Sequence, residues 1–350
     1  MIDKNFCMSS YMAFRYIERD GMDFYEGFHH SNIQAVPESE QTPVHTSQDI
    51  SDAIQRVFDS LTGQKLGIML SGGMDSANLA SYMKGCDAYT FRFDGADNNQ
   101  RTELQRAENY AAFHGLKLHY VDINWKVATR NLKEIMRAKA APVHSIEPQI
   151  YAAAMQAKAD GVERMIVGES SDLLFGGMDQ LISREWKFED FKNRYIFTKP
   201  EDVLADPVSM DYLFERYRKD GDMIDYMAFM DNVFAIESSS SYLNAFTLAG
   251  MPYTDPYAKL KMADPLDLQR VRNGEPKYLI RGLFAMKYPG IPIPFKVPMP
   301  RPVDYYFKDW EGPKRPEFRK DLQMDKFTGN QKWQLFCLEY FLDCFDDGKA

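Results

Sequence analysis

The sequence predicts an α/β fold in which helices flank a parallel sheet, followed by a mostly helical lobe. Between residues 65 and 180, short apolar runs typical of buried parallel strands alternate with segments of helical periodicity. Strands and helices in this alternation form right-handed βαβ units, which build a parallel sheet. Beyond Gly177 the chain becomes rich in aromatic residues and helical in pattern, which predicts the second lobe.

The expected elements follow one another regularly along the chain. We expect strands at residues 66–70, 88–93, 117–123 and 165–167, and helices after Ser47, from Asp75, and at residues 102–114 and 148–160. Residues 1–62 are expected to form an N-terminal arm closed by a helix. Residues 63–350 form the main domain, with an α/β core at 63–180 and the helical lobe at 181–350. Ligands of such sheets bind at the carboxyl ends of the strands.

Composition narrows the class of protein. The 350 residues are 45% hydrophobic and 27% charged, which suits one large globular domain or two smaller ones. The net charge of −9 argues against nucleic-acid partners and against an anionic membrane surface. The N-terminus lacks the apolar core of a signal peptide, and no apolar run reaches membrane-spanning length. We therefore expect a cytoplasmic protein that acts on small molecules.

Cysteine and histidine spacing predicts neither a disulfide framework nor a zinc site. The four cysteines form no CxxC pair, and a reducing compartment explains them as thiols. The six histidines form no HExxH pattern. Any metal ion is therefore expected to be held by carboxylates.

A phosphate-binding loop is predicted where the first strand ends. The segment reads Leu70-Ser71-Gly72-Gly73-Met74-Asp75-Ser76, between an apolar strand and a helical pattern. Glycines let the backbone approach a ligand, serine hydroxyls donate hydrogen bonds, and the N–H groups at a helix start attract anions. Asp75 is a candidate ligand for Mg²⁺. The Gly-Lys-Ser/Thr ending of a Walker A loop is absent, and a plain strand-to-helix turn with capping residues is the alternative.

These residues resemble the SGGxDS signature of the PP-loop ATP pyrophosphatases, whose fold is of the adenine nucleotide α-hydrolase type. The resemblance implies that the loop binds the β- and γ-phosphates of ATP and releases them as pyrophosphate. It also implies an adenine site against the first two strands. The expected cofactor-binding residues are Leu70, Ser71, Gly72, Gly73, Asp75, Ser76, Phe91, Phe93 and Gly168.

A second motif is similar to one in asparagine synthetases. The run Gly168-Glu169-Ser170-Ser171-Asp172-Leu173-Leu174-Phe175-Gly176-Gly177 follows a predicted strand and resembles GEGxDELFGG. The resemblance implies Asp75 and Asp172 as ligands of Mg²⁺, and Glu169 as the base that accepts a proton from the attacking amine or as the group that orients it. Glu169 as a magnesium-shell or helix-capping carboxylate is the alternative.

Further pieces extend the resemblance toward the C-terminus. Pro252-Tyr253-Thr254-Asp255 stands where the family has PFLD, and Lys277-Tyr278-Leu279-Ile280-Arg281 resembles its K-x-hydrophobic-LR helix. Lys296 then corresponds to a catalytic lysine that lies over the reacting phosphate and acyl group. A surface lysine in a proline-rich loop is the alternative reading.

The resemblance implies an ATP-dependent ligase that adenylates a carboxylate, releases pyrophosphate, and transfers the acyl group to ammonia or an amine. Ile2 stands where glutamine-dependent members have a nucleophilic cysteine, so we expect nitrogen from ammonia, a substrate amine or a separate glutaminase. The charged residues that precede PFLD are also missing, which predicts an altered acceptor pocket. Two alternatives stay open: an adenylating enzyme that acts on another oxygen, of the tRNA or sulfur-transfer type, and an inactive nucleotide-binding protein.

Overall fold

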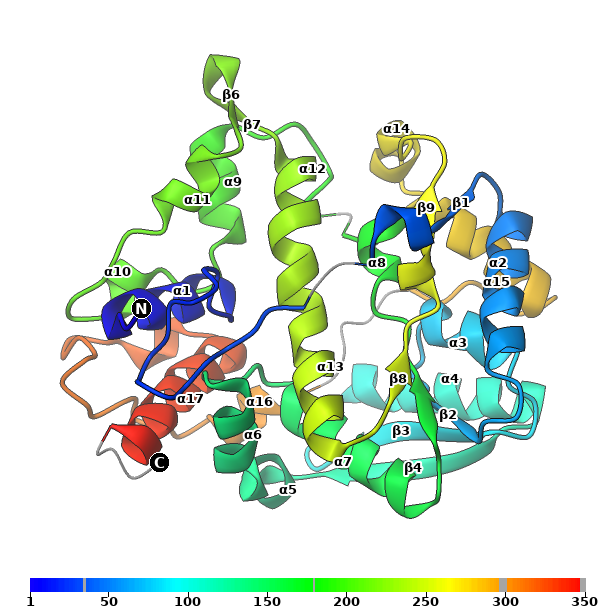
Figure 1. The fold of residues 1–350 in the computed structure, drawn as a ribbon, viewed down its shortest axis with the longest axis horizontal. Coiled ribbons are helices and arrows are strands. Elements are labelled where there is room, and N and C mark those ends of the chain that lie inside the picture. Colours follow the sequence, from blue (N-terminus) through cyan, green and yellow to red (C-terminus); the bar gives the residue numbers. More distant parts are fainter. Residues whose placement is uncertain (34–35, 179, 296–300, 347–350) are drawn as a thin grey trace.

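The computed structural model describes residues 1–33, 36–178, 180–295 and 301–346. Its central element is a parallel sheet of five strands in the order β4-β3-β2-β5-β8 (Figure 1). The strands are β2 (Leu66–Met69), β3 (Asp87–Phe93), β4 (Lys117–Ile123), β5 (Arg164–Ile166) and β8 (Tyr253–Thr254). The structure confirms the predicted α/β fold class and the four strands expected from the apolar runs.

Apolar side chains that point alternately to the two faces of the sheet bury both faces. Ile68 of β2 is in register with Ala88 and Ile166, and all three belong to one apolar cluster. The next residue, Met69, is in register with Tyr89 and belongs to the cluster on the opposite face. Successive side chains of a strand point to opposite faces, so an unbroken apolar run serves both.

Helices from distant parts of the sequence cover the two faces. The cluster that contains Ile68 includes residues of α2 (Ser47–Ser60), α3 (Met74–Ala80), α4 (Asn98–His114) and α15 (Tyr278–Lys287). The cluster that contains Met69 includes residues of α7 (Glu147–Ala159) and α13 (Ala235–Ala249). The predicted helices after Ser47, from Asp75, and at residues 102–114 and 148–160 are therefore confirmed.

Strand β8 is the main departure from the predicted pattern. It comes from the part of the chain expected to be helical, yet its Tyr253 pairs with Met165 at the edge of the sheet. Two residues are too few to give a period-2 pattern, and only the neighbouring strand β5 defines them as a strand. The division at residue 180 between the α/β core and the helical lobe stays a prediction. The structure adds that the chain returns to the sheet beyond residue 180, at β8.

Most of the remaining helices contribute to a second core, rich in aromatic side chains. They are α1 (Lys4–Phe14), α5 (Trp125–Arg130), α6 (Leu132–Lys139), α9 (Phe188–Tyr195), α10 (Pro200–Val203), α11 (Asp211–Glu215), α12 (Tyr226–Phe229), α14 (Leu268–Arg272), α16 (Val303–Tyr306) and α17 (Gly329–Phe345). The short α8 (Ser171–Leu174) lies just after β5. Two small pairings complete the fold: β1 (Thr42–Val44) with β9 (Leu260–Met262), and β6 (Arg218–Lys219) with β7 (Met223–Ile224).

One long helix joins the lobe to the sheet. Helix α12 passes through a π-helical turn at Met230–Phe234 directly into α13, and Figure 1 shows the three as one continuous rod. Residues Phe234, Glu237 and Ser241 of this rod follow at helical spacing and line one cavity, which is described below. A π-helical turn inside an α-helix often marks a functional site.

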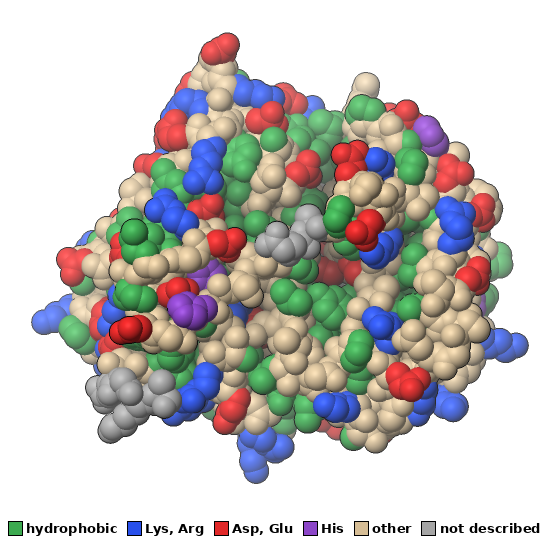
Figure 2. Space-filling model, viewed as in Figure 1, with side chains coloured by type: hydrophobic (Ala, Val, Ile, Leu, Met, Phe, Trp, Pro, Cys, Tyr) green, Lys and Arg blue, Asp and Glu red, His purple; other side chains and the backbone are tan. Residues whose placement is uncertain are grey.

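The surface carries charges of both signs. Figure 2 shows acidic and basic side chains interspersed over the face seen in Figure 1. No helix within the described ranges combines the length and the apolar character needed to cross a lipid bilayer.

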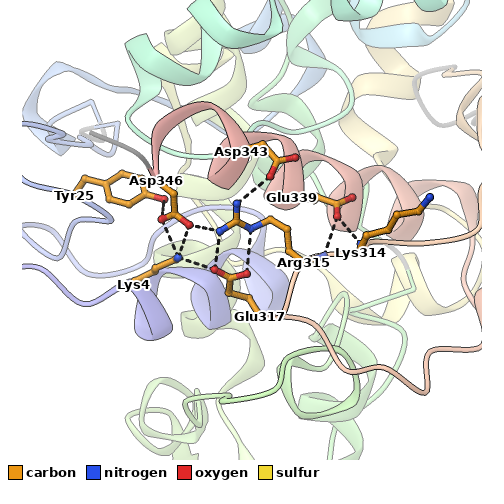
Figure 3. A network of polar contacts seen from close by, with 8 residues as sticks. All are labelled: Lys4, Tyr25, Lys314, Arg315, Glu317, Glu339, Asp343 and Asp346. Carbon is orange, nitrogen blue, oxygen red and sulfur yellow. Dashed lines mark hydrogen bonds and ion pairs between the residues drawn. The ribbon is translucent and has the colours of Figure 1, made fainter. Parts of the chain in front are cut away.

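A polar network fixes the N-terminal helix to the C-terminal one (Figure 3). Arg315 donates to Glu317 at 2.8 Å and to Asp343 at 2.9 Å, and it also pairs with Asp346. Lys4 of α1 reaches the same Glu317 at 2.8 Å. Hydrogen bonds from Arg315 are the main reason that the pKa of Glu317 falls to about 2. The network therefore joins α1, α17 and the segment that precedes α17.

Arg315→Met should destabilise the protein by roughly 2 kcal/mol at pH 7, because the partly buried Glu317 and Asp346 and the exposed Asp343 lose their shared guanidinium. The folded pKa of Glu317 lies below its ordinary value, so this stability is present above pH 4.5 and lost as pH falls toward 2. Urea unfolding at several pH values measures the effect. Arg319→Met, which removes an exposed pair with Asp321, is the matched control and should hardly change stability. Equal effects of the two substitutions would contradict a structural role for the network.

Candidate active site

The two predicted motif loops meet at the topological switch point of the sheet. Strands β2 and β5 are adjacent, and the chain leaves β2 toward β3 on one side but leaves β5 toward β8 on the other. A crevice at the carboxyl ends of strands forms where the strand order reverses in this way. A cavity of about 380 Å³ lies here, lined by residues of both loops.

Serine hydroxyls shape the loop after β2. The Ser71 N–H donates to Ser76 Oγ at 3.0 Å, and the two hydroxyls lie 2.9 Å apart. The Gly73 N–H donates to Ser71 Oγ at 3.2 Å. A Cβ on Gly72 would lie 2.5 Å from the backbone oxygen of Glu103, so close packing against α4 requires glycine there. The loop is thus a tight turn with hydroxyl groups facing one another.

The loop after β5 is held by the aspartate of the predicted PYTD motif. Asp255 accepts hydrogen bonds from the N–H groups of Ser170, at 2.7 Å, and Tyr257, at 3.0 Å. Burial raises the pKa of Asp255 to about 6. Hydrogen bonds from Ser170, Tyr257 and Ala258 act in the opposite direction but do not outweigh burial. Asp255 therefore positions the second loop and does not line the cavity.

Lys277 joins the carboxylates of both loops. Its Nζ lies 2.6 Å from Asp75 Oδ2 and also pairs with Asp172 Oδ1. The lysine side chain is only 5% exposed. Burial lowers the pKa of Lys277, but the negative charges of Asp75 and Asp172 outweigh it and raise the pKa overall. Three charged groups from separate segments therefore form one cluster, in which the lysine is buried and the two carboxylates are partly exposed.

Backbone geometry allows this cluster. Lys277 has a left-handed conformation, with φ 54°, immediately before α15. Such a conformation is uncommon for a residue with a side chain and is found most often at functional sites. A Cβ on Gly177 would lie 2.1 Å from Asp172 Oδ1 and 2.2 Å from Lys277 Cε. Glycine is therefore required at position 177 for the lysine to reach Asp172.

The donor set fits a magnesium ion. Asp75 and Asp172 present carboxylate oxygens that converge on one cationic position, which Lys277 Nζ takes in this structure. Mg²⁺ in nucleotide sites is held by one or two carboxylates together with phosphate oxygens and water. No group of three or more His, Cys, Asp or Glu side chains that could hold a metal by itself occurs among the described residues.

An apolar section of the cavity lies along β2 and β3 and at the end of β5. Leu70, Phe91, Phe93 and Gly168, all predicted as nucleotide-binding, line the cavity there. Met69, Tyr89 and Val167 extend the same apolar lining. Flat apolar surfaces of this kind suit a heterocyclic ring.

A second group of polar side chains lines the cavity beside Glu169. We call Arg15, His144, Glu237 and Arg301 the arginine pocket. Arg15 forms a 3.0 Å ion pair with Glu237, a residue of α13. Tyr242, also on α13, hydrogen-bonds Glu169, and its pKa is raised well above the usual range by burial first and by Glu169 second.

The structure places most of the predicted site residues together. Ser71, Gly73, Asp75, Ser76, Glu169 and Asp172 all line the cavity. Gly72 does not line it and packs against Glu103 instead. Lys296 lies outside the described residues, so its predicted role is not placed. Leu248 and Gly250, which replace charged residues of the family before PYTD, do not line the cavity either.

Several residues at the site were not predicted from the sequence. Lys277 had a signal, since it opens the KYLIR segment that resembles the K-x-hydrophobic-LR helix of the family. Arg15, Glu103, His144, Glu237 and Arg301 carried no local signal, because only the tertiary fold brings them to the cavity. The sequence therefore predicted the two loops, but not the residues that other segments bring to the cavity.

Glu103 is a buried carboxyl beside the phosphate loop. Burial raises its pKa to about 7, partly offset by the hydrogen bond from the Gly72 N–H and the charge of Arg106. Within the described part of the chain, Glu103 Oε2 has no hydrogen-bond partner. Because the folded pKa exceeds the ordinary value of 4.5, the stability linked to this carboxyl is full below pH 4.5 and is lost as pH rises through 7.

Glu103→Gln removes this loss of stability, since the amide stays neutral at every pH. The free energy of unfolding of the variant minus that of the wild type should therefore increase by roughly 2 kcal/mol as the pH rises from 5 to 8. Denaturant unfolding at a series of pH values measures the difference. Glu134→Gln, at an exposed carboxylate, is the control and should show no such trend. A constant difference between Glu103→Gln and the wild type would refute the raised pKa.

Comparison with known proteins places the two motif loops in a family. The family model for asparagine synthase matches residues 49–257, and no curated protein sequence matches the chain. Among solved structures, NMN synthetase from Francisella tularensis is 12% identical with a TM-score of 0.27, covering 72% of this chain and 96% of its own. NAD+ synthetase from Burkholderia pseudomallei is 12% identical with a TM-score of 0.24, covering 71% and 91%. Likenesses with TM-scores this low carry no weight for the activity of the chain.

The match to the family model covers more than half of the chain. It includes the loop Ser71–Ser76, the loop that begins at Gly168, and Asp255, which positions the second loop. Lys277 and the two arginines of the cavity lie beyond it. On the strength of this match, the chain belongs to the asparagine synthase family.

Proposed function

We propose that this chain is an ATP-dependent ligase that adenylates a carboxylate, releases pyrophosphate, and transfers the acyl group to ammonia or an amine. The observation that carries the proposal is the meeting of Asp75, Asp172 and Lys277 on one wall of the cavity. Two carboxylates suit a magnesium nucleotide, and a buried ammonium suits the charge that develops on phosphate. Family membership supports the same chemistry.

The nucleotide is proposed to bind across the switch point. Adenine would lie against the apolar lining of Leu70, Phe91 and Phe93, and the phosphates against the Ser71–Ser76 loop. Asp75 and Asp172 would hold Mg²⁺, which neutralises charge on the pyrophosphate leaving group when it is bound. Lys277 would then exchange its carboxylate partners for phosphate oxygens, since both present negative charge to the same ammonium.

The first half-reaction needs a carboxylate brought up to the α-phosphate. A carboxylate oxygen attacks the α-phosphorus, the bond to the bridging oxygen breaks, and pyrophosphate leaves with that electron pair. Negative charge on the phosphoryl oxygens is greater in the transition state than in ATP. A buried cation placed before the reaction stabilises this charge without reorganisation, which is the role proposed for Lys277.

In the second half-reaction, an amine attacks the acyl carbon, the bond to AMP breaks, and one proton must leave the nitrogen. Glu169 is the proposed acceptor of that proton, because it lines the cavity three residues beyond β5. We propose free ammonia or an amine as the nitrogen donor for this chain. Burial raises the pKa of Cys7 to about 12, and the pKa values of the other three cysteines are raised as well. None of the four suits the nucleophile of a glutaminase.

ATP–pyrophosphate exchange across a panel of carboxylic acids tests the proposal. We expect exchange with at least one acid, and with that acid plus ammonium or an amine, AMP and pyrophosphate formed in equal amounts. Glutamine should not replace ammonium. Formation of ADP and phosphate would refute the proposal, and exchange dependent on tRNA or on a sulfur donor would favour the alternative enzyme class. Tight ATP binding without exchange would indicate an inactive nucleotide-binding protein.

Lys277→Ala should lower the rate of AMP formation at saturating ATP by roughly two to three orders of magnitude. The effect should fall on kcat more than on the KM for ATP, because the charge that Lys277 meets grows in the transition state. Lys287→Ala is the matched control, since that ammonium lies over the Tyr82 ring at 4.1 Å and does not line the cavity. Melting temperatures of both variants show whether the fold survives. A well-folded Lys277→Ala protein with wild-type kcat would assign the catalytic cation elsewhere.

A further inference from the structure

Helix α4 brings the buried carboxyl of Glu103 to the phosphate loop. The side chain lines the cavity, as does that of Gln100 one helical turn before it, although Glu103 is only 6% exposed. A Cβ on Gly72 would lie 2.7 Å from Glu103 Cγ, so the glutamate lies directly against the middle of the Ser71–Ser76 loop. Helix α4 packs beside α3, which begins within the same loop (Figure 1). The fold therefore fixes the carboxyl beside the loop.

The carboxyl of Glu103 is only partly hydrogen-bonded. The Gly72 N–H donates to the carboxyl, whereas Oε2 is buried and has no partner within the described ranges. An ionised oxygen that is buried without a donor is strongly disfavoured. A protonated oxygen at the same place can instead donate a hydrogen bond to a ligand. The unpartnered oxygen is therefore suited to carry a proton and to meet an acceptor in the cavity.

The charged groups around Glu103 leave it close to neutral. Burial raises its pKa to about 7, while the hydrogen bond from the loop and the charge of Arg106 act in the opposite direction. Arg106, on the next turn of α4, is engaged elsewhere: its Nη1 donates to the Phe295 carbonyl at 3.1 Å, and its guanidinium lies over the Phe295 ring at 4.1 Å. Asp75, the carboxylate of the loop, is paired with Lys277. Both of these cations are thus bound to other groups, and Glu103 can hold a proton near neutral pH.

We propose that Glu103 binds the nucleotide as a neutral acid, donating a hydrogen bond to a phosphate oxygen of ATP, so that nucleotide binding takes up a proton. The proposal rests on the proposed function and adds a proton-linked control of its phosphate site. A charged carboxylate beside the loop would repel the phosphates, whereas a carboxylic acid donates to them. The negative charge of the phosphates in turn favours the protonated form. The proton comes from solvent on binding and returns to solvent when pyrophosphate leaves.

Binding of MgATP to the wild type and to Glu103→Gln tests the inference. The amide is the neutral counterpart of the protonated acid, because at every pH it accepts through its oxygen and donates through its nitrogen. Above pH 7, the Kd of the wild type should rise by up to about tenfold per pH unit relative to that of Glu103→Gln. Near pH 6 the two proteins should bind equally. Isothermal titration calorimetry without a carboxylate substrate measures both constants, and the titration of the ligand itself cancels in their ratio.

Proton counting tests the same inference without relying on a variant. Calorimetry at pH 8 in buffers of different ionisation enthalpy should show the wild type taking up about one proton per MgATP, and Glu103→Gln correspondingly less. Glu103→Leu, which is of similar size but has no donor, should bind MgATP with a Kd about tenfold above that of Glu103→Gln at every pH. Glu108→Gln is the control on the same helix, since that carboxylate accepts from the Tyr120 hydroxyl at 2.9 Å outside the cavity. It should keep the pH dependence of the wild type.

The possible outcomes separate this inference from the proposed function. A constant ratio of the wild-type and Glu103→Gln dissociation constants from pH 6 to pH 9, in two folded proteins, would overturn the inference and leave the proposed function intact. Release of a proton by the wild type on binding would also overturn it, because Glu103 would then meet the nucleotide as a carboxylate. Absence of MgATP binding by the wild type at every pH would overturn the proposed function itself. Melting temperatures of the variants show whether each protein is folded.

Discussion

The site depends on one interaction, the bridge of Lys277 between Asp75 and Asp172. It brings together the loops after β2 and β5 and the start of α15, three segments separated by about a hundred residues each. Several local features permit this bridge. They are the left-handed backbone of Lys277, the glycine at position 177 that leaves room for the lysine side chain, and the Ser171 hydroxyl, which donates to Asp75 Oδ1 at 2.6 Å. Without the lysine, these two partly buried carboxylates would repel each other.

Under the proposed function, the same bridge explains how the site can be stable before a magnesium nucleotide binds. Carboxylates that will hold a metal ion must remain ionised and close together, which is unfavourable unless a cation lies between them. Lys277 supplies that cation, and the negative charges keep its own pKa high despite burial. An ammonium on a flexible stem can then turn from carboxylate to phosphate, whereas the rigid fork of an arginine would hold the carboxylates in place.

The sequence predicted the elements whose signals are local. The apolar runs of β2 to β5 predicted the sheet, and the glycines and serines at the ends of β2 and β5 predicted the two loops. Both predictions succeed because buried strands and turns are determined largely by residues that are adjacent in the sequence. Strand β8 was missed because two residues define it only through pairing with β5. Arg15 and His144 were missed for a similar reason: a single arginine after a helix or a histidine in a loop has no pattern until packing brings it to a cavity. Glu169 and Lys277 lie between these cases, since a resemblance pointed to them but only the fold shows what surrounds them.

The residues that the sequence predicted and the arginines that it missed lie in different parts of the chain. Most of the residues proposed to face the nucleotide lie at the ends of the strands and within the segment matched by the family, where the geometry of the switch point constrains them. Both arginines of the arginine pocket lie outside that segment, on the N-terminal helix and just before α16. Helix α13 connects the two parts, because Phe246 packs in the core on the sheet while Glu237 pairs with Arg15. His144 and Glu237 of the same pocket lie within that segment, so this part of the cavity is built by the matched and the unmatched parts of the chain together.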